Sequence, residues 1–82
     1  MITSIFNGTT KIDSIARKIV GAIINGRHTT DIIVKYLHLE TEYKNVCFAL
    51  AILLQEGIVE YHKNNMAHEY GYFITDKGWS CI

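Results

Sequence analysis

In residues 46–59, VCFALAILLQEGIV, the spacing of the apolar residues changes at a glycine, and this change divides the sequence into a helical part and a β-hairpin. Before Gly57 the apolar residues follow the period of a helix, which we expect to run from 42 to 56 and to end at that glycine. The inward face of this helix and the residue just past its end are Val46, Leu50, Leu53 and Ile58. The opposite side is also apolar and carries Phe48, Ala51 and Ile52. A second apolar side of this kind must be covered, either by the rest of the domain or by a partner.

A β-hairpin is expected after the glycine, because the apolar period changes there from that of a helix to two. The sequence predicts strands over 58–63 and 70–75, joined by a short loop at 64–67 in which an asparagine tolerates a positive φ. Residues 75–82 are predicted to form a turn followed by a segment too short for an independent helix. We expect the ring of Trp79 to pack back against the core.

Two further helices are predicted before residue 42. Apolar residues recur at helical spacing from 12 to 24, after a cap at Thr10 and before an Asn-Gly pair that ends the helix. A shorter helix is expected over 31–37, with the hydroxyl of Thr29 or Thr30 as its cap. The predicted order is therefore three helices followed by a hairpin.

The composition is that of a small globular domain, with 82 residues, 49% hydrophobic residues and no proline. We expect a single domain over 1–82, with its core between about 11 and 78. The longest apolar run, 46–54, is shorter than the roughly 20 residues that cross a bilayer, so we expect a cytoplasmic protein without a membrane partner. Eight Lys and Arg balance eight Asp and Glu, which leaves no overall electrostatic attraction to nucleic acid. Residues 1–35 nevertheless hold five basic and two acidic side chains, so one face can still be basic.

The order of three helices and a hairpin resembles the winged helix-turn-helix superfamily of transcriptional regulators, and above all its shortest bacterial and phage members. The segments 46–50 and 56–59 are similar to the end of the recognition helix in that family. Tyr72-Phe73-Ile74-Thr75-Asp76-Lys77-Gly78 resembles the aromatic, aliphatic, threonine, acidic, lysine, glycine ending common in its members. The resemblance covers roughly residues 11–78. It implies an α+β, mainly α, fold: a three-helix bundle with a helix-turn-helix, followed by a two-stranded β-hairpin wing.

The resemblance also implies double-stranded DNA as a partner, with the third helix in the major groove and the wing over the backbone or a minor groove. Asn45 is a residue type that reads adenine, and Lys44 is one that reaches guanine or phosphate. The full set of residues expected to contact DNA is Thr41, Tyr43, Lys44, Asn45, Lys63, Asn64, Asn65, His68, Arg27 and Lys35. Ordinary solvated helix starts and hairpin tips carry the same residue types. Glu40, Glu42 and Glu69 stand close in sequence to this set and would repel phosphates.

Phe48 and Ile52, one helical turn apart, support a second interpretation. Burying two such side chains contributes about 3 to 6 kcal/mol, enough to favour a homodimer or a protein partner. The domain would then be a protein-interaction module, such as a coregulator or a phage-encoded inhibitor. Packing of the same two side chains inside the domain is equally compatible with the sequence.

Motifs for catalysis or metal binding are not found, and we expect neither an enzyme nor a bound cofactor or metal. Ser14 and Ser80 lack a neighbouring histidine and acid, and the apolar run around Cys47 lowers thiol reactivity. The four histidines have neither the helical spacing nor the cysteine partners of a zinc site. One weaker alternative is that His62 and His68 face each other across the hairpin.

Overall fold

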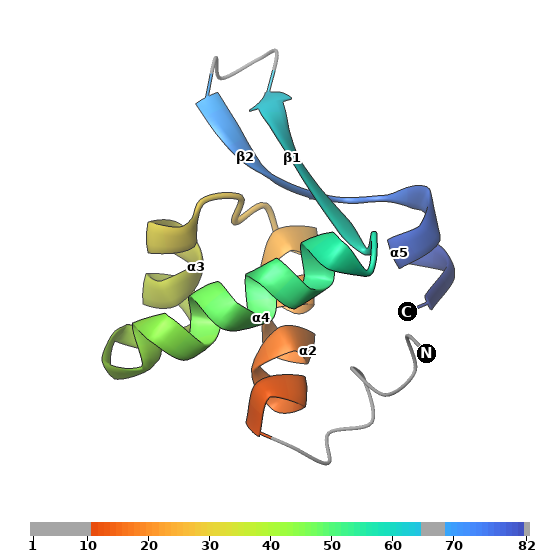
Figure 1. Cartoon of the computed structure of the whole chain (residues 1–82). Helices are drawn as coiled ribbons and strands as arrows, with labels where there is room; N and C mark the ends of the chain where they lie inside the picture. Colours follow the sequence, from red (N-terminus) through yellow and green to blue (C-terminus); the bar gives the residue numbers. More distant parts are fainter. Residues whose placement is uncertain (1–10, 65–68, 82) are drawn as a thin grey trace.

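The computed structural model describes residues 11–64 and 69–81, which form a mainly helical α+β fold (Figure 1). Its elements in chain order are the helices α2 (Lys11–Ile24) and α3 (Thr30–Leu37), the 3₁₀ helix η1 (Glu40–Glu42), the helix α4 (Tyr43–Gln55), the strands β1 (Val59–Asn64) and β2 (Glu69–Ile74), and the helix α5 (Asp76–Cys81). The two strands pair as an antiparallel sheet after the helices. This order is compatible with a winged-helix layout.

The ends of the helices lie where short-range signals place them. α2 ends before Gly26, whose φ of 88° is a left-handed conformation that glycine adopts without strain. Thr29, rather than Thr30, is the cap of α3, since its hydroxyl accepts a hydrogen bond from the Ile32 amide at 3.3 Å. The cap predicted at Thr10 lies outside the described residues. His38 ends α3 in the left-handed region, and this residue directs the chain toward η1 and α4.

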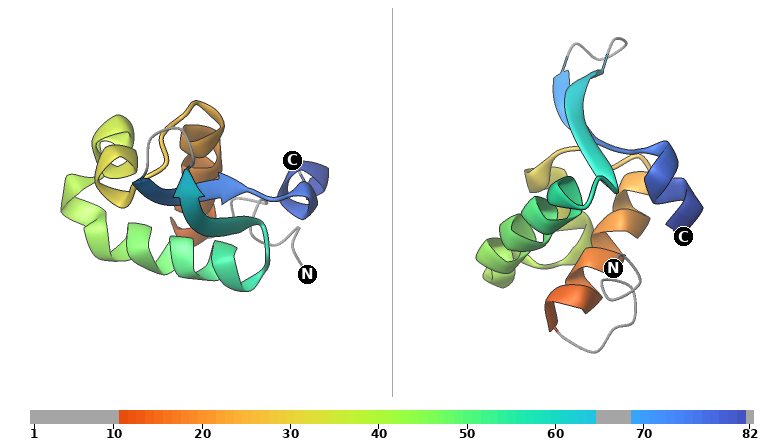
Figure 2. Two further views of the ribbon diagram at one scale, coloured as in Figure 1. Left: turned by 90° about the horizontal axis from the view of Figure 1, so that it is seen from above. Right: turned by 45° about the vertical axis from the view of Figure 1, so that its right-hand side comes forward.

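The core lies between α2 and α4, which cross each other, with α3 and the base of the hairpin closing it (Figures 1 and 2). The largest fully buried side chains are Ile19, Ile33, Val46, Leu50, Leu53, Ile58 and Val59. The predicted inward face of the third helix is therefore confirmed. Gly57, at a φ of 75°, ends α4 and turns the chain into β1.

The hairpin is joined to the helices through the connection between α2 and α3. The Tyr72 amide donates to the His28 carbonyl at 2.7 Å, and the Nδ1 of His28 donates to the Tyr72 carbonyl at 2.9 Å. Gly71 allows this approach, because a Cβ there would lie 2.9 Å from both the carbonyl oxygen and the Cβ of His28. These contacts fix the direction in which the two strands leave the helical core.

The end of the chain corrects the prediction made for residues 75–82. Asp76 to Gly78 start the helix α5 instead of forming a separate turn, because the hydroxyl of the preceding Thr75 accepts a hydrogen bond from the Gly78 amide at 2.9 Å. The same hydroxyl donates to the Gly57 carbonyl at 2.5 Å, which attaches the helix to the end of α4. The Trp79 ring is 54% exposed and does not pack into the core, so that prediction is wrong.

Candidate functional site

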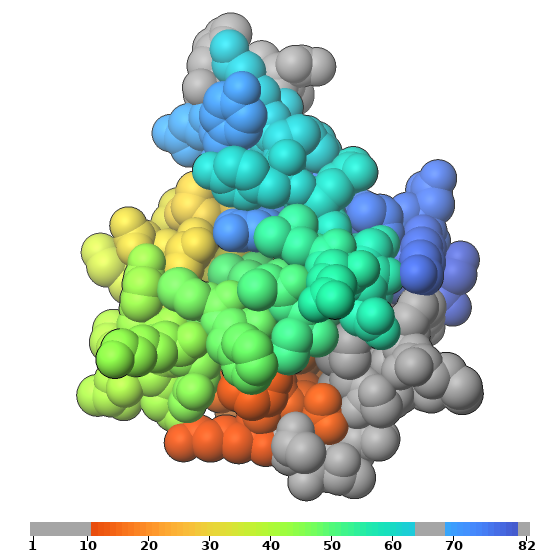
Figure 3. Space-filling model, viewed as in Figure 1, coloured from red at the N-terminus to blue at the C-terminus, as the bar shows by residue number. Residues whose placement is uncertain are grey.

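The side of α4 that faces away from the core is solvent exposed along the whole helix. We call it the outward face of α4, and its exposed residues are Tyr43, Lys44, Cys47, Phe48, Ala51, Leu54 and Gln55. The helix crosses the front of the molecule below the hairpin (Figure 3). Lys44 is the only charged member of the outward face, which is otherwise mostly apolar.

The structure separates the two residues of the predicted apolar patch. Phe48 is 59% exposed, so the alternative that it belongs to the core is wrong. Ile52 is partly buried and packs against the core from the edge of α4. An apolar contact surface on α4 would therefore centre on Phe48 and its exposed neighbours, with Ile52 at its border.

The start of α4 is held by an ion pair that sequence reasoning missed. Lys11, at the beginning of α2, lies 2.5 Å from the Glu42 carboxylate, measured from Nζ to Oε1. The Lys11 ammonium, through this contact and its charge, is the main cause that lowers the pKa of Glu42, with smaller contributions from Asn45 and Lys18. Glu42 is thus partly neutralised by Lys11. Asn45 is half-buried at the start of α4 and is not part of the outward face.

Tyr43 is exposed next to the α3 helix and keeps its phenolic proton. Repulsion from Cys47 raises the pKa of Tyr43 most, followed by partial desolvation and the charge of Asp31. A shallow cavity of about 260 Å³ connects Tyr43 with Lys35 and Glu40. The phenol is therefore a hydrogen-bond donor beside one lysine and two carboxylates, which makes this edge of α4 electrostatically mixed.

The two faces of the hairpin differ in chemistry because alternate residues point to opposite sides. Beyond the buried base, one side carries Tyr61, Lys63, Tyr70 and Tyr72, and we call these four residues the tyrosine face. The Tyr61 ring lies 5.7 Å from the Tyr70 ring and 4.9 Å from the Tyr72 ring, between centroids. Tyr72 packs against the core, whereas Tyr61 and Tyr70 are 53% and 58% exposed.

The other side of the hairpin is a stack of three rings. Phe73 lies between His28 and His62, with both histidine centroids 4.4 Å from its own. His62 also contacts the Glu60 carboxylate at 3.2 Å and pairs across the sheet with Gly71. The alternative that His62 faces His68 gains no support, since His68 lies outside the described residues.

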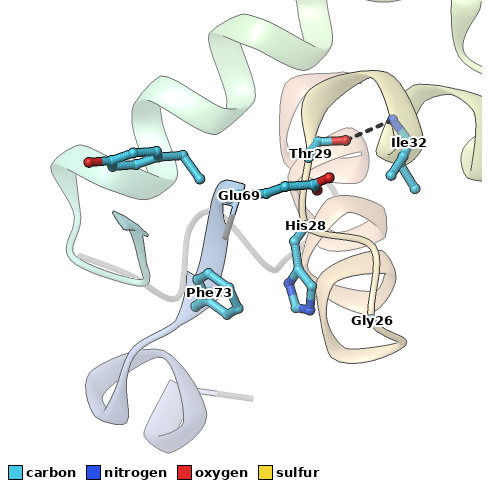
Figure 4. A pocket seen from close by; sticks show the side chains of 8 residues that line it. Gly26, His28, Thr29, Ile32, Glu69 and Phe73 are labelled. Atoms are coloured by element: carbon cyan, nitrogen blue, oxygen red, sulfur yellow. Dashed lines mark hydrogen bonds between the residues drawn. The ribbon is translucent and has the colours of Figure 1, made fainter. Parts of the chain in front are cut away.

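A cavity of about 210 Å³ lies between β2 and the connection from α2 to α3. Its lining residues are Gly26, His28, Thr29, Ile32, Glu69, Tyr70, Gly71 and Phe73, and Glu69 extends from β2 toward the start of α3 (Figure 4). The Thr29 hydroxyl is used by the cap of α3, and Nδ1 of His28 by the Tyr72 carbonyl. His28 therefore uses Nδ1 to hold the hairpin to the helices, and the Thr29 hydroxyl serves the start of α3.

The residues predicted to contact DNA fall into three groups. Exposed near α4 or on the hairpin are Thr41, Tyr43, Lys44, Lys35 and Lys63. Arg27 and Asn45 are half-buried. The Arg27 guanidinium lies 4.5 Å from the Tyr36 ring centroid, and one of its nitrogens lies 2.7 Å from the Asn25 carbonyl. Asn64 ends β1, although nothing is described of its side chain, and Asn65 lies with His68 outside the described residues.

The tyrosine face was not among the predicted site residues. Its signal was present in the sequence, since Tyr70 and Tyr72 alternate on one strand and Tyr61 and Lys63 on the other. What the sequence left open was the register, which sets Tyr61 opposite Tyr72 and Lys63 opposite Tyr70.

Residues 11–64 and 69–81 contain no group of three or more His, Cys, Asp or Glu side chains arranged to hold a metal ion. No helix in this part of the chain is long and apolar enough to span a bilayer. Comparison of the chain with protein-family models, with curated proteins and with solved structures finds no match. The basis for a functional proposal is therefore the geometry of α4 and the hairpin.

Proposed function

We propose that this chain is a small winged-helix DNA-binding protein that regulates transcription. α4 would enter the major groove of a duplex, and the hairpin would lie over the backbone or an adjacent minor groove. The observation that carries the proposal is the position of α4, which is buried along one side and open to solvent along its outward face, directly below the hairpin (Figure 3). A helix of about 10–12 Å diameter fits a major groove of about 12 Å width.

Within this proposal the start of α4 provides the polar contacts. Lys44 reaches a phosphate or a guanine, and the protonated phenol of Tyr43 donates to a phosphate. The ion pair with Lys11 reduces the repulsion that the Glu42 carboxylate would exert at the same end of the helix. Asn45 is half-buried and therefore less accessible to a base edge than Lys44.

The middle of the outward face is suited to thymine rather than to guanine. Phe48 and Ala51 carry no hydrogen-bonding side-chain atoms, whereas apolar side chains contact the thymine methyl group in the major groove. We therefore expect A·T-rich duplexes to be preferred. The zero net charge of the chain predicts modest affinity and a salt dependence set by only a few phosphate contacts.

Fluorescence anisotropy at two salt concentrations tests the proposal, with Lys44→Glu compared against Arg17→Glu. Arg17 is an exposed residue of α2, so the two variants change the net charge equally. Loss of a phosphate contact at Lys44 should lower the slope of log affinity against log salt by about 0.9, whereas Arg17→Glu leaves the slope unchanged. The proposal is refuted if the unmodified protein binds no duplex at low salt, or if both variants weaken binding equally.

The exposure of Phe48 favours one second candidate, a winged-helix protein-interaction module or homodimer that uses the same face of α4. Phe48→Lys distinguishes the two. If the outward face meets DNA, the added charge tightens duplex binding and steepens the salt dependence. If it meets a second copy, sedimentation velocity shows a dimer in the unmodified protein that the variant lacks.

A further inference from the structure

We propose that the tyrosine face of the hairpin binds unpaired nucleic-acid bases. This inference rests on the proposed function and extends it, because it makes the preferred partner a duplex that continues into a single strand. The duplex would lie on the outward face of α4 and the unpaired bases on Tyr61 and Tyr70.

The rings of the tyrosine face are available for stacking. Tyr61 and Tyr70 are each more than half exposed, and their planes differ by 24° at a centroid distance of 5.7 Å. Tyr72 is tilted by 55° against Tyr61 and is partly buried, so it supports the exposed pair from below. Single-stranded nucleic acid is bound by exposed aromatic rings of this kind, since every base has a flat face that stacks.

The charges of the hairpin are divided between its two faces in a way that suits a phosphate backbone. Lys63 is exposed on the tyrosine face, directly opposite Tyr70 in the register. Glu60 and Glu69, the acidic residues of the described strands, lie on the opposite face, where Glu60 contacts His62. A strand stacked on the tyrosines would therefore meet a lysine and no carboxylate from β1 or β2.

A protein partner fits the same face less well. Its two aliphatic residues, Val59 and Ile74, are at the base of the hairpin, where Val59 is buried and Ile74 packs against the core. What remains exposed is two rings with hydroxyl groups and one ammonium group. In protein interfaces of useful affinity the aromatic residues lie in an apolar centre from which water is excluded. The described part of this face does not provide such a centre.

The test compares three labelled DNA ligands by anisotropy: a blunt A·T-rich duplex, the same duplex with an oligothymidine tail, and the oligothymidine alone. The tail should tighten binding at least about fivefold over the blunt duplex, through base stacking on the exposed rings. The double variant Tyr61→Leu, Tyr70→Leu should lose this gain and keep the affinity for the blunt duplex. The matched control Tyr61→Phe, Tyr70→Phe keeps the rings and should keep the gain.

The outcomes separate this inference from the proposed function. Binding of the blunt duplex with no gain from the tail overturns the inference alone and assigns the tyrosine face to another partner, such as a protein. Binding of the tail and the oligothymidine without the blunt duplex overturns duplex recognition and retains the inference. A gain that survives in the leucine variant, or one that the phenylalanine control loses, also overturns it.

Discussion

Replacing Gly71 by alanine should weaken the attachment of the hairpin to the helices. We expect this substitution to destabilise the protein more than any substitution on the exposed surface. An added Cβ would lie 2.9 Å from the carbonyl oxygen and the Cβ of His28, closer than such atoms approach in proteins. β2 must therefore move away from the connection between α2 and α3. The movement stretches the two hydrogen bonds between His28 and Tyr72, which are 2.7 and 2.9 Å long.

The size of the effect follows from these contacts. Two hydrogen bonds contribute about 0.5–1.5 kcal/mol each, and overpacking costs about 1–3 kcal/mol. Alanine restricts the unfolded chain and offsets about 0.4–1 kcal/mol of this loss, because Gly71 has no positive φ. We expect the free energy of unfolding to fall by about 1–5 kcal/mol, a large share of the roughly 4–12 kcal/mol expected for a domain of this length.

Urea unfolding followed by circular dichroism measures this change, and Gly21→Ala is the matched control. Gly21 lies inside α2, where an added Cβ meets no atom within 4 Å. The same substitution should therefore raise the free energy of unfolding there by about 0.5–1 kcal/mol. The reasoning is refuted if Gly71→Ala unfolds at the same urea concentration as the unmodified protein, or if both variants shift in the same direction.

Three further predictions concern single side chains. Thr29→Ala should lower the free energy of unfolding by about 1 kcal/mol through loss of the α3 cap, and Thr29→Ser should restore most of it in the same urea experiment. Lys11 lowers the folded-state pKa of Glu42, so the ion pair stabilises the fold above the ordinary glutamate pKa, and this stabilisation is lost as pH falls through the lowered value. Glu42→Gln should therefore lose less stability on acidification than the unmodified protein. An unchanged pH profile in this variant would contradict the ion pair. Trp79, at 54% exposure, should emit like an indole in water and be quenched by iodide, whereas a blue-shifted and protected emission would show a buried ring.

Short-range signals in the sequence were enough to predict most of the elements. The ends of α2 and α4 follow from Gly26 and Gly57, because only a residue without a Cβ adopts those φ values without strain. The change of apolar period at Gly57 placed the strands within a residue or two. Exposure of Lys44 and burial of Val46 followed from the helical period alone.

The helix α5 shows where such signals were insufficient. Its six residues are too few to be stable in isolation, so the sequence predicted a turn. The helix forms because the Thr75 hydroxyl bonds both to the Gly78 amide and to the Gly57 carbonyl. Gly57 lies 18 residues earlier in the chain, and no local pattern shows that it will be there.

By itself the sequence determined most of the secondary structure, the inward faces of α2, α3 and α4, and the polar residues at the start of α4, since the repeat of a helix or strand sets which side chains share a side. Only the tertiary structure decided what those residues can do. It paired Glu42 with Lys11, left Phe48 in solvent, and brought Tyr61 and Tyr70 together on the tyrosine face. These outcomes depend on contacts between segments far apart in the chain, and such contacts follow from how the elements pack rather than from the period of any one of them.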